Sequence, residues 1–202
     1  MVIKSAEFVK SSARADQCPP PEFPEYAFTG RSNVGKSSVL NMLTGKRKLA
    51  KTSSTPGKTQ LINHFLINNS WYLADLPGYG YAKASRKMRK EFSTLIMKYI
   101  ENRKNLVCLF VLVDSRHAPL TSDMNFIRWL GENLVPFVIL FTKCDKLPAI
   151  KLEKNINVYL GVLKQEWENL PQYFCTSALK QTGKDQVLDF INETNAGLAT
   201  KT

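Results

Sequence analysis

The sequence predicts an α/β protein with a mostly parallel six-stranded sheet, one antiparallel strand and helices on both faces of the sheet. Two observations lead to this fold class. Short apolar runs alternate with longer segments in which apolar residues recur every three or four positions, and this alternation is typical of parallel sheets. Two apolar runs that flank the tight polar turn Asn68–Ser70 form a hairpin, which supplies the antiparallel strand.

The chain opens with an extended segment, Val2–Val9, followed by the proline-rich stretch Cys18–Pro24. Prolines fix φ and lack an N–H donor, so this stretch should form a surface connection. No internal repeat, low-complexity tract or second boundary follows. We therefore expect an N-terminal extension over residues 1–22, a single domain over residues 23–198 and a short tail over residues 199–202.

The remaining elements follow from apolar periodicity and from start and stop signals. Leu106–Val113 is continuously apolar, as expected for a strand buried on both faces. Gly45 is predicted to end the first helix, and Thr121 to cap the third. Strands are predicted at Tyr26–Thr29, Gln60–Ile67, Trp71–Leu76, Leu106–Val113, Pro136–Phe141 and Tyr173–Thr176, and helices at Ser37–Leu43, Ser85–Asn102, Thr121–Asn133, Ala149–Glu168 and Asp185–Asn195.

Composition indicates a globular protein with an anionic partner. The chain has 202 residues, 44% of them apolar, and a formal net charge of +11. Proteins this basic often bind nucleic acid, although a lysine-rich surface can also serve solubility alone. The four cysteines lack metal-ligand spacing and are expected to be reduced thiols. The first ten residues lack an apolar signal, and the longest apolar run is far too short to span a bilayer. We expect a cytoplasmic protein that does not enter a membrane.

A phosphate-binding loop is predicted between the first strand and the first helix of the domain. Residues 30–37 read Gly-Arg-Ser-Asn-Val-Gly-Lys-Ser, which matches the P-loop pattern in the required context. Glycines let backbone N–H groups converge on the phosphates of a nucleotide, and the helix N-terminus favours their charge. Lys36 is expected to neutralise the β- and γ-phosphates, and Ser37 to bind Mg²⁺. The predicted contacts are Gly30, Arg31, Ser32, Asn33, Val34, Gly35, Lys36 and Ser37.

A second motif, Asp-x-x-Gly, ends the strand Trp71–Leu76. Asp75 can hold Mg²⁺ through a water molecule, and Gly78 can present its N–H to the γ-phosphate. Leu76 and Pro77 lie between them. Taken alone the pattern is often only a turn, but here it follows the P-loop by about 40 residues on the next strand pair.

A third motif predicts the choice of base. Thr142, Lys143, Cys144 and Asp145 follow an apolar strand. The Asp145 carboxylate can accept hydrogen bonds from guanine N1–H and N2–H₂, which adenine does not offer, and such paired contacts discriminate by roughly 1–3 kcal/mol. The Lys143 stem could lie along the base. A fourth segment, Thr176, Ser177 and Ala178, could present backbone N–H groups to guanine O6. Read in isolation, either segment could be an ordinary loop.

The order and spacing of these motifs resemble the G domain of small GTPases. The strings Gly30-Arg-Ser-Asn-Val-Gly-Lys-Ser-Ser38, Thr55-Pro-Gly-Lys-Thr-Gln60, Asp75-Leu-Pro-Gly-Tyr-Gly-Tyr81 and Val113-Asp-Ser-Arg-His-Ala-Pro119 are similar to the EngB (YihA/YsxC) family of bacterial GTPases. The resemblance extends from about Phe23 to the last helix. It implies a single P-loop G domain that binds GTP and GDP with Mg²⁺ and hydrolyses GTP.

The resemblance also implies roles for individual residues. Ser37 and Thr59 would bind Mg²⁺, with Thr55 as a rival for the second position. Thr59 belongs to the switch segment Lys51–Leu61, of which Gly57, Lys58, Thr59, Gln60 and Leu61 are expected to contact the nucleotide. Thr142 stands where such domains usually carry Asn, so a weaker tether on the base side is expected. Lys36, Thr59, Gly78 and Asn33 are the residues expected to act in hydrolysis.

Tyr79 replaces the glutamine that orients the attacking water in Ras-type domains. We therefore expect slow intrinsic hydrolysis that needs a stimulator. A partner could supply it. Alternatively, Asn33 could help to bind K⁺ near the phosphates, as in the potassium-stimulated bacterial GTPases that the chain resembles.

Basic residues surround the expected switch segments and suggest RNA as a partner. Residues 83–104 contain Lys83, Arg86, Lys87, Arg89, Lys90, Lys98, Arg103 and Lys104, and residues 46–58 contain Lys46, Arg47, Lys48, Lys51 and Lys58. These could also form a solvated helix face. The resemblance implies ribosomal RNA or large-subunit particles as the partner, and a link to cell division and septation. A monomer is expected.

Two other functions remain open at this point. One is a P-loop ATPase or small-molecule kinase, against which Asp145 argues. The other is a regulatory GTP/GDP-binding switch in which hydrolysis is incidental, which Tyr79 favours.

Overall fold

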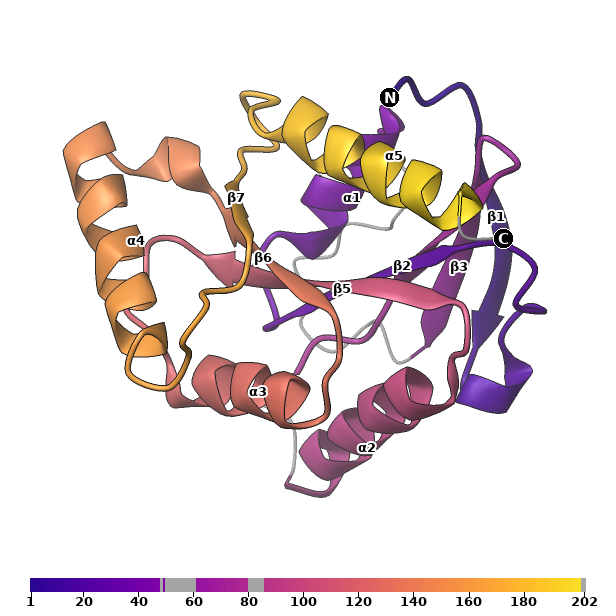
Figure 1. The fold of residues 1–202 in the computed structure, drawn as a ribbon, viewed down its shortest axis with the longest axis horizontal. Coiled ribbons are helices and arrows are strands. Elements are labelled where there is room, and N and C mark those ends of the chain that lie inside the picture. The colour runs from indigo at the N-terminus through magenta and orange to yellow at the C-terminus, as the bar shows by residue number, and fades with distance from the viewer. Residues whose placement is uncertain (48, 50–60, 80–85, 201–202) are drawn as a thin grey trace.

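The computed structural model describes residues 1–47, 49, 61–79 and 86–200, with the side chains of residues 86–93 left out of the description. The predicted switch residues Gly57, Lys58, Thr59 and Gln60, and the rival Thr55, therefore lie outside the described residues, whereas Leu61 is described and exposed. A central twisted sheet is covered by helices on both sides (Figure 1).

The sheet confirms the predicted fold class. In the described residues it has seven strands in the order β1-β3-β4-β2-β5-β6-β7. Strand β3 is antiparallel to β1 and β4, and the other neighbouring pairs are parallel. The strands are β1 (Ala6–Ser12), β2 (Glu25–Gly30), β3 (Ile62–Ile67), β4 (Trp71–Asp75), β5 (Leu106–Asp114), β6 (Phe137–Thr142) and β7 (Tyr173–Cys175).

The seventh strand corrects the predicted count of six. It is β1, which comes from the segment expected to be an N-terminal extension and forms the sheet edge beside β3. Most of its side chains are exposed, among them Phe8 and Val9. Without an alternating apolar face, the sequence carries no signal that a strand here joins the core sheet.

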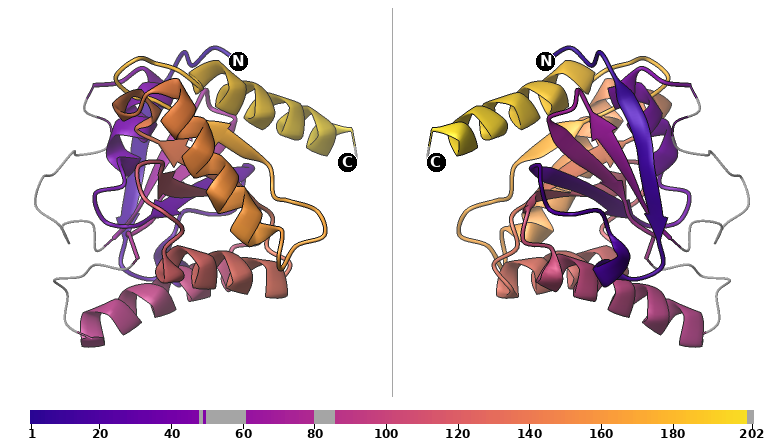
Figure 2. Two further views of the ribbon diagram at one scale, coloured as in Figure 1. Left: turned by 90° about the vertical axis from the view of Figure 1, so that its left-hand side faces the viewer. Right: turned by 90° about the vertical axis from the view of Figure 1, so that its right-hand side faces the viewer.

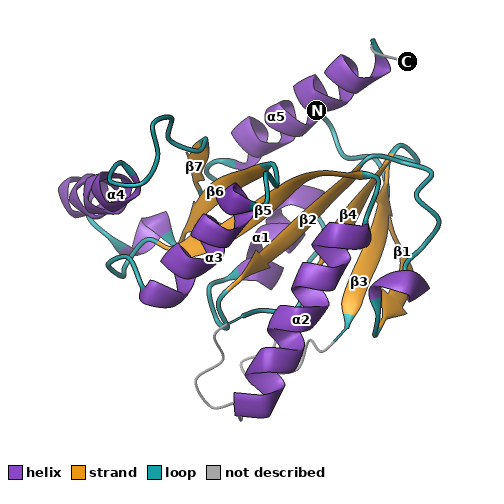
Figure 3. Ribbon diagram, turned by 60° about the horizontal axis from the view of Figure 1, so that its bottom comes forward, coloured by secondary structure: helices purple, strands orange, loops and turns teal. Residues whose placement is uncertain are grey.

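The helices form two layers. They are α1 (Lys36–Thr44), α2 (Arg86–Asn102), α3 (Thr121–Glu132), α4 (Ala149–Leu163) and α5 (Lys184–Ala199), with short 3₁₀ turns at Ala15–Gln17 and Cys144–Lys146. Helices α1 and α5 pack on one face of the sheet, and α2, α3 and α4 on the other (Figures 1 and 2). Figure 3 shows α2 and α3 crossing the same face. Among the described residues, no helix is both long and apolar enough to cross a membrane.

The central position of β5 in the sheet explains why its sequence is continuously apolar. Phe110 and Leu112 belong to the core under α1 and α5, whereas Leu109, Val111 and Val113 belong to the core under α2, α3 and α4. All five side chains are at most 3% exposed. The strand is therefore buried on both faces, as predicted.

Two predicted helix boundaries need correction and one is confirmed. Helix α3 begins at Thr121, so the cap position belongs to Leu120, which has an extended backbone and no side-chain oxygen to cap with. Helix α4 ends at Leu163 rather than at residue 168, because the chain turns there and Trp167 packs edge-on against Phe137 with ring centroids 5.6 Å apart. Gly45 ends α1 in the left-handed region, with φ at 67°.

Candidate nucleotide-binding site

The predicted motifs meet at one edge of the sheet. Strands β2, β4, β5, β6 and β7 are parallel to one another, so their carboxyl ends lie along the same edge. The P-loop follows β2, the Asp-x-x-Gly motif begins at the end of β4, and the segments containing Asp145 and Ser177 follow β6 and β7. This edge is where α/β sheets bind ligands.

The P-loop leaves the sheet at Gly30, where no side chain fits. A Cβ atom at this position would lie 2.7 Å from the Leu112 carbonyl oxygen of β5. The loop then passes through Asn33, which has a positive φ of 63° that asparagine tolerates better than most residues. It enters α1 at Lys36. Backbone N–H groups at the start of this helix can therefore face an anion.

Lys36 forms an ion pair with Asp75, which connects the P-loop to the end of β4. Both side chains are almost fully buried, at 10% and 4% exposed. Beyond Asp75 the chain continues alongside the P-loop. The Thr29 hydroxyl donates to the Pro77 carbonyl at 3.0 Å, and the Tyr79 N–H donates to the Gly30 carbonyl at 3.1 Å.

Gly78 lies so close to the P-loop that a larger residue would not fit. A Cβ atom there would lie 2.9 Å from the Gly30 carbonyl oxygen and 3.4 Å from the Ser32 nitrogen. The two segments predicted to contact the γ-phosphate are therefore adjacent in the described structure. Leu76, between Asp75 and Gly78, is fully buried in the core.

Thr142 and Lys143 bind the P-loop from the opposite side. The Thr142 hydroxyl lies 2.6 Å from the Val34 carbonyl oxygen and 3.2 Å from that of Val113. The Lys143 ammonium donates to the Asn33 carbonyl at 2.6 Å. A threonine hydroxyl and a lysine ammonium thus connect this segment to the P-loop.

Asp114, at the end of β5, holds Lys143 in this position. Its carboxylate lies 2.9 Å from the Lys143 ammonium and also accepts from the Arg116 guanidinium at 2.8 Å. Burial alone would raise the pKa of Asp114, but these hydrogen bonds lower it to about 2. Sequence reasoning assigned no role to Asp114. A signal was present, because a carboxylate directly after a buried parallel strand is placed at the ligand-binding edge.

Asp145 and Ser177 connect the two segments predicted to read the base. The Ser177 hydroxyl donates to Asp145 at 2.7 Å, and the Lys180 N–H donates to that hydroxyl at 3.0 Å. The hydrogen bond from Ser177 lowers the pKa of Asp145, which keeps the carboxylate ionised and able to accept hydrogen bonds at neutral pH. The Cys144 N–H also donates to the Thr176 carbonyl, at 3.2 Å.

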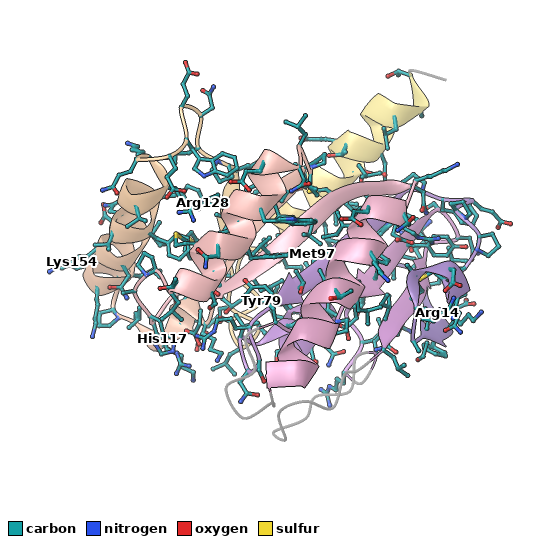
Figure 4. All side chains as sticks on the ribbon, turned by 90° about the horizontal axis from the view of Figure 1, so that it is seen from below. Arg14, Tyr79, Met97, His117, Arg128 and Lys154 are labelled. Atoms are coloured by element: carbon teal, nitrogen blue, oxygen red, sulfur yellow. The ribbon has the colours of Figure 1, made fainter. Side chains whose placement is uncertain are left out.

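The Tyr79 side chain belongs to the core under α2, α3 and α4 (Figure 4). Its side chain is 6% exposed, and its ring centroid lies 4.7 Å from that of Phe126 in α3. Burial raises the pKa of the phenol well above its usual value. The phenol is therefore directed into the protein interior rather than towards solvent at the P-loop.

One member of the predicted basic surface is not available to a partner. Arg103 donates two hydrogen bonds to Glu25, at 2.8 and 2.6 Å, and its side chain is 7% exposed. His64 and Tyr99 contact the same fully buried carboxylate. The sequence alone does not predict this ion pair, because β2 and the end of α2 come together only in the tertiary structure. The described residues Lys46, Arg47, Lys98 and Lys104 are exposed.

Comparison with known proteins identifies the family. A model of the family described as 50S ribosome-binding GTPase matches residues 25–143. A probable GTP-binding protein EngB of Christiangramia forsetii is 55% identical over 96% of this chain and 98% of its own. One of Bacteroides fragilis is 55% identical over the full length of both chains. The crystal structure of a probable GTP-binding protein engB has the same fold, with a TM-score of 0.64 and 23% identity over 86% of this chain and 99% of its own.

The two EngB relatives match this chain over 96% and 100% of its length. The chain belongs to the EngB family of GTP-binding proteins and is a GTPase.

Proposed function

We propose that this GTPase acts as a Mg²⁺-dependent switch in the assembly of the large ribosomal subunit. The nucleotide-dependent part of the proposal rests on the junction between the P-loop and the loop predicted to bind the base, through Thr142 and Lys143. A nucleotide that contacts both loops would find them already fixed relative to each other, which lowers the ordering cost of binding.

In this proposal the guanine base lies against Asp145, with the backbone of Thr176, Ser177 and Ala178 on its other edge. The phosphates lie in the P-loop from Gly30 to Ser37. Lys36 turns from Asp75 to the β- and γ-phosphates, which frees the carboxylate to hold a water ligand of the metal. A competition assay tests the nucleotide: unlabelled GTP should displace labelled GDP, and ATP at equal concentration should not.

Ser37 and Thr59 are proposed to hold Mg²⁺. The donor chemistry fits, since Mg²⁺ prefers oxygen ligands and Ser37 and Asp75 both offer oxygen at this edge. Bound there, Mg²⁺ would neutralise charge on the β- and γ-phosphate oxygens. Ser37→Ala should therefore abolish the gain in GDP affinity that Mg²⁺ gives the wild type. The neighbouring Ser38, which is exposed and lies outside the predicted ligand set, provides a matched control as Ser38→Ala.

Hydrolysis is proposed to be slow in the isolated protein. Gly78 can offer its N–H to the γ-phosphate, but the buried Tyr79 leaves the attacking water without a side chain to orient it.

We propose that K⁺ bound near Asn33 supplies part of the missing stabilisation of the transition state. The exposed side chain of Asn33, whose amide oxygen can bind a cation, supports this placement. Equal hydrolysis rates in K⁺ and Na⁺ buffers would rule out a cation role.

The partner is proposed to be ribosomal RNA in large-subunit particles of the cytoplasm, contacted by a monomer. The net charge of +11 and the exposed Lys98 and Lys104 support a phosphate-contacting surface. By family resemblance we also propose a link to cell division and septation. Pelleting with ribosomal subunits tests the partner: binding should be stronger with a GTP analogue than with GDP and should weaken steeply with salt.

A regulatory switch with incidental hydrolysis is the second candidate, because Tyr79 is buried. Single-turnover rates separate the two. If large subunits accelerate hydrolysis, turnover belongs to the function; if they bind the GTP form without accelerating it, recruitment alone is the function.

A further inference from the structure

Two cysteines occupy equivalent positions in the two segments that are predicted to contact guanine. Cys144 directly precedes Asp145, and Cys175 directly precedes Thr176. Both residues are partly buried, and both pack against the same core cluster under α2, α3 and α4. Any movement of either cysteine is therefore passed directly to a residue of the base site.

The backbone around the pair is held together by one carbonyl group. The Phe141 carbonyl accepts from the Thr176 N–H at 2.7 Å, from the Thr176 hydroxyl at 3.0 Å and from the Cys144 thiol at 3.4 Å. Phe141 and Cys175 are paired across β6 and β7. The Cys144 N–H donates back to the Thr176 carbonyl at 3.2 Å. The Cys144 thiol therefore contacts the residue that pairs with Cys175, and the two cysteines lie close together at the ends of β6 and β7.

The two thiols differ in reactivity. The neighbouring Cys175 thiol lowers the pKa of Cys144, whereas the neighbouring Cys144 sulfur and burial raise the pKa of Cys175. A thiol with a lowered pKa beside a second thiol is the arrangement found at redox-sensitive cysteines. The other cysteines differ: burial raises the pKa of Cys108 to about 12 and also raises that of Cys18.

We propose that Cys144 and Cys175 form a reversible disulfide when a hydroperoxide oxidises them, and that this disulfide weakens guanine-nucleotide binding. The Cys144 thiolate attacks the peroxide oxygen, the O–O bond breaks, and a sulfenic acid and hydroxide form. The Cys175 thiol then attacks the sulfenic sulfur, the S–O bond breaks, and water leaves. In total two thiols and one hydrogen peroxide give one disulfide and two waters. The binding effect rests on the proposed placement of guanine against Asp145.

Disulfide formation must change the geometry of the base site. The S–S bond is about 2.05 Å long, which is shorter than any contact between two non-bonded sulfur atoms, and it fixes the Cβ–Cβ distance at about 3.5–4.5 Å. The ends of β6 and β7 would move together, and Asp145 and Thr176 would move with them. Bound nucleotide would oppose this movement. By linkage, GDP should disfavour disulfide formation at equilibrium by the same factor as the disulfide weakens GDP binding.

The test uses the full chain with Cys18→Ser, which removes the half-exposed thiol far from the site and leaves the buried Cys108 as an internal reference. Hydrogen peroxide should produce a species that has lost two hydrogen atoms, with a cross-link between the peptides containing residues 144 and 175. GDP affinity should fall roughly 10- to 100-fold, the range expected when paired base contacts are lost. Dithiothreitol should restore it.

Two variants provide controls, each compared with its own unoxidised sample. In Cys175→Ser, Cys144 should stop at the sulfenic acid and react with dimedone. In Cys144→Ser, Cys175 should not react. A disulfide that leaves GDP affinity unchanged, or peroxide treatment that yields no cross-link between these peptides, overturns the proposal. Failure of the reduced protein to bind GDP would instead count against the proposed function, while the cross-link would still report on the cysteine pair.

Discussion

The hydroxyl of Thr142 lies 2.6 Å from the carbonyl oxygen of Val34, in a contact that joins residues 108 positions apart in the chain. It connects the end of β6 to the P-loop, and both atoms are buried. The loop predicted to select the base and the loop predicted to bind the phosphates therefore form one unit in the described structure.

Replacing Thr142 with Val should separate these loops. The variant keeps the side-chain shape but leaves the buried Val34 carbonyl without its donor, which costs about 1–3 kcal/mol. Urea unfolding should show this loss, and GDP affinity should fall with it. Thr142→Ser retains the hydroxyl and should stay close to wild type in both measurements. Equal stability of the Val and Ser variants would show that the hydrogen bond contributes nothing.

Replacing Tyr79 with Gln should not restore a water-positioning side chain. The side chain at this position is buried against Phe126, so Gln would leave a cavity and an unpaired amide at a cost of about 2–4 kcal/mol. Single-turnover hydrolysis in K⁺ buffer should not become faster. Tyr79→Phe, which keeps the ring, provides the control for packing. A several-fold faster rate in Tyr79→Gln would contradict the inward orientation of this residue.

Glu25 should make stability depend on pH in the acidic range. Although burial alone would raise its pKa, hydrogen bonds from Arg103, His64 and Tyr99 lower it from 4.5 to about 2. A lowered folded-state pKa gives stability that is present above pH 4.5 and is lost as the pH falls towards 2. Glu25→Gln should cost about 3 kcal/mol at neutral pH, because it leaves Arg103 buried without its partner.

Urea unfolding of wild type and Glu25→Gln across this pH range checks the sign. The stability difference between the two proteins should shrink as the pH falls below about 4.5. A difference that is constant with pH would show that the Glu25 charge is not what stabilises the fold.

Gly78 and Gly161 offer a matched pair of substitutions. A Cβ atom at Gly78 would lie 2.9 Å from the Gly30 carbonyl, whereas one at Gly161 meets nothing within 4 Å. Gly78→Ala should therefore cost about 1–3 kcal/mol and slow GTP hydrolysis. Gly161→Ala, in the last turn of α4, should stabilise the protein by up to about 1 kcal/mol and leave hydrolysis unchanged. Normal stability and hydrolysis in Gly78→Ala would contradict the close packing of these two segments.

Much of the fold was predictable because its signals are local. The continuous apolar run of β5, the turn between β3 and β4 and the P-loop each carry their information within a few residues. Strand β1 was placed in the extension because its exposed face has no apolar period, and only its pairing with β3 brings it into the sheet.

The site was predictable in its motifs but less so in its contacts. Asp114 and Arg103 are charged residues whose partners, Lys143 and Glu25, are distant in sequence. Their pairing depends on how the strands are ordered in the sheet, which no local pattern specifies. The inward direction of Tyr79 likewise depends on the position of α3.

The most direct test of the central claim, that Asp145 reads guanine, is the binding of GDP, XDP and ADP to the wild type and to Asp145→Asn. An asparagine amide can donate to the C2 oxygen of xanthine but cannot accept the two guanine donors. We predict that the wild type prefers GDP and that Asp145→Asn prefers XDP, with GDP affinity reduced roughly 10- to 100-fold. Unchanged GDP preference in Asp145→Asn would contradict the assignment.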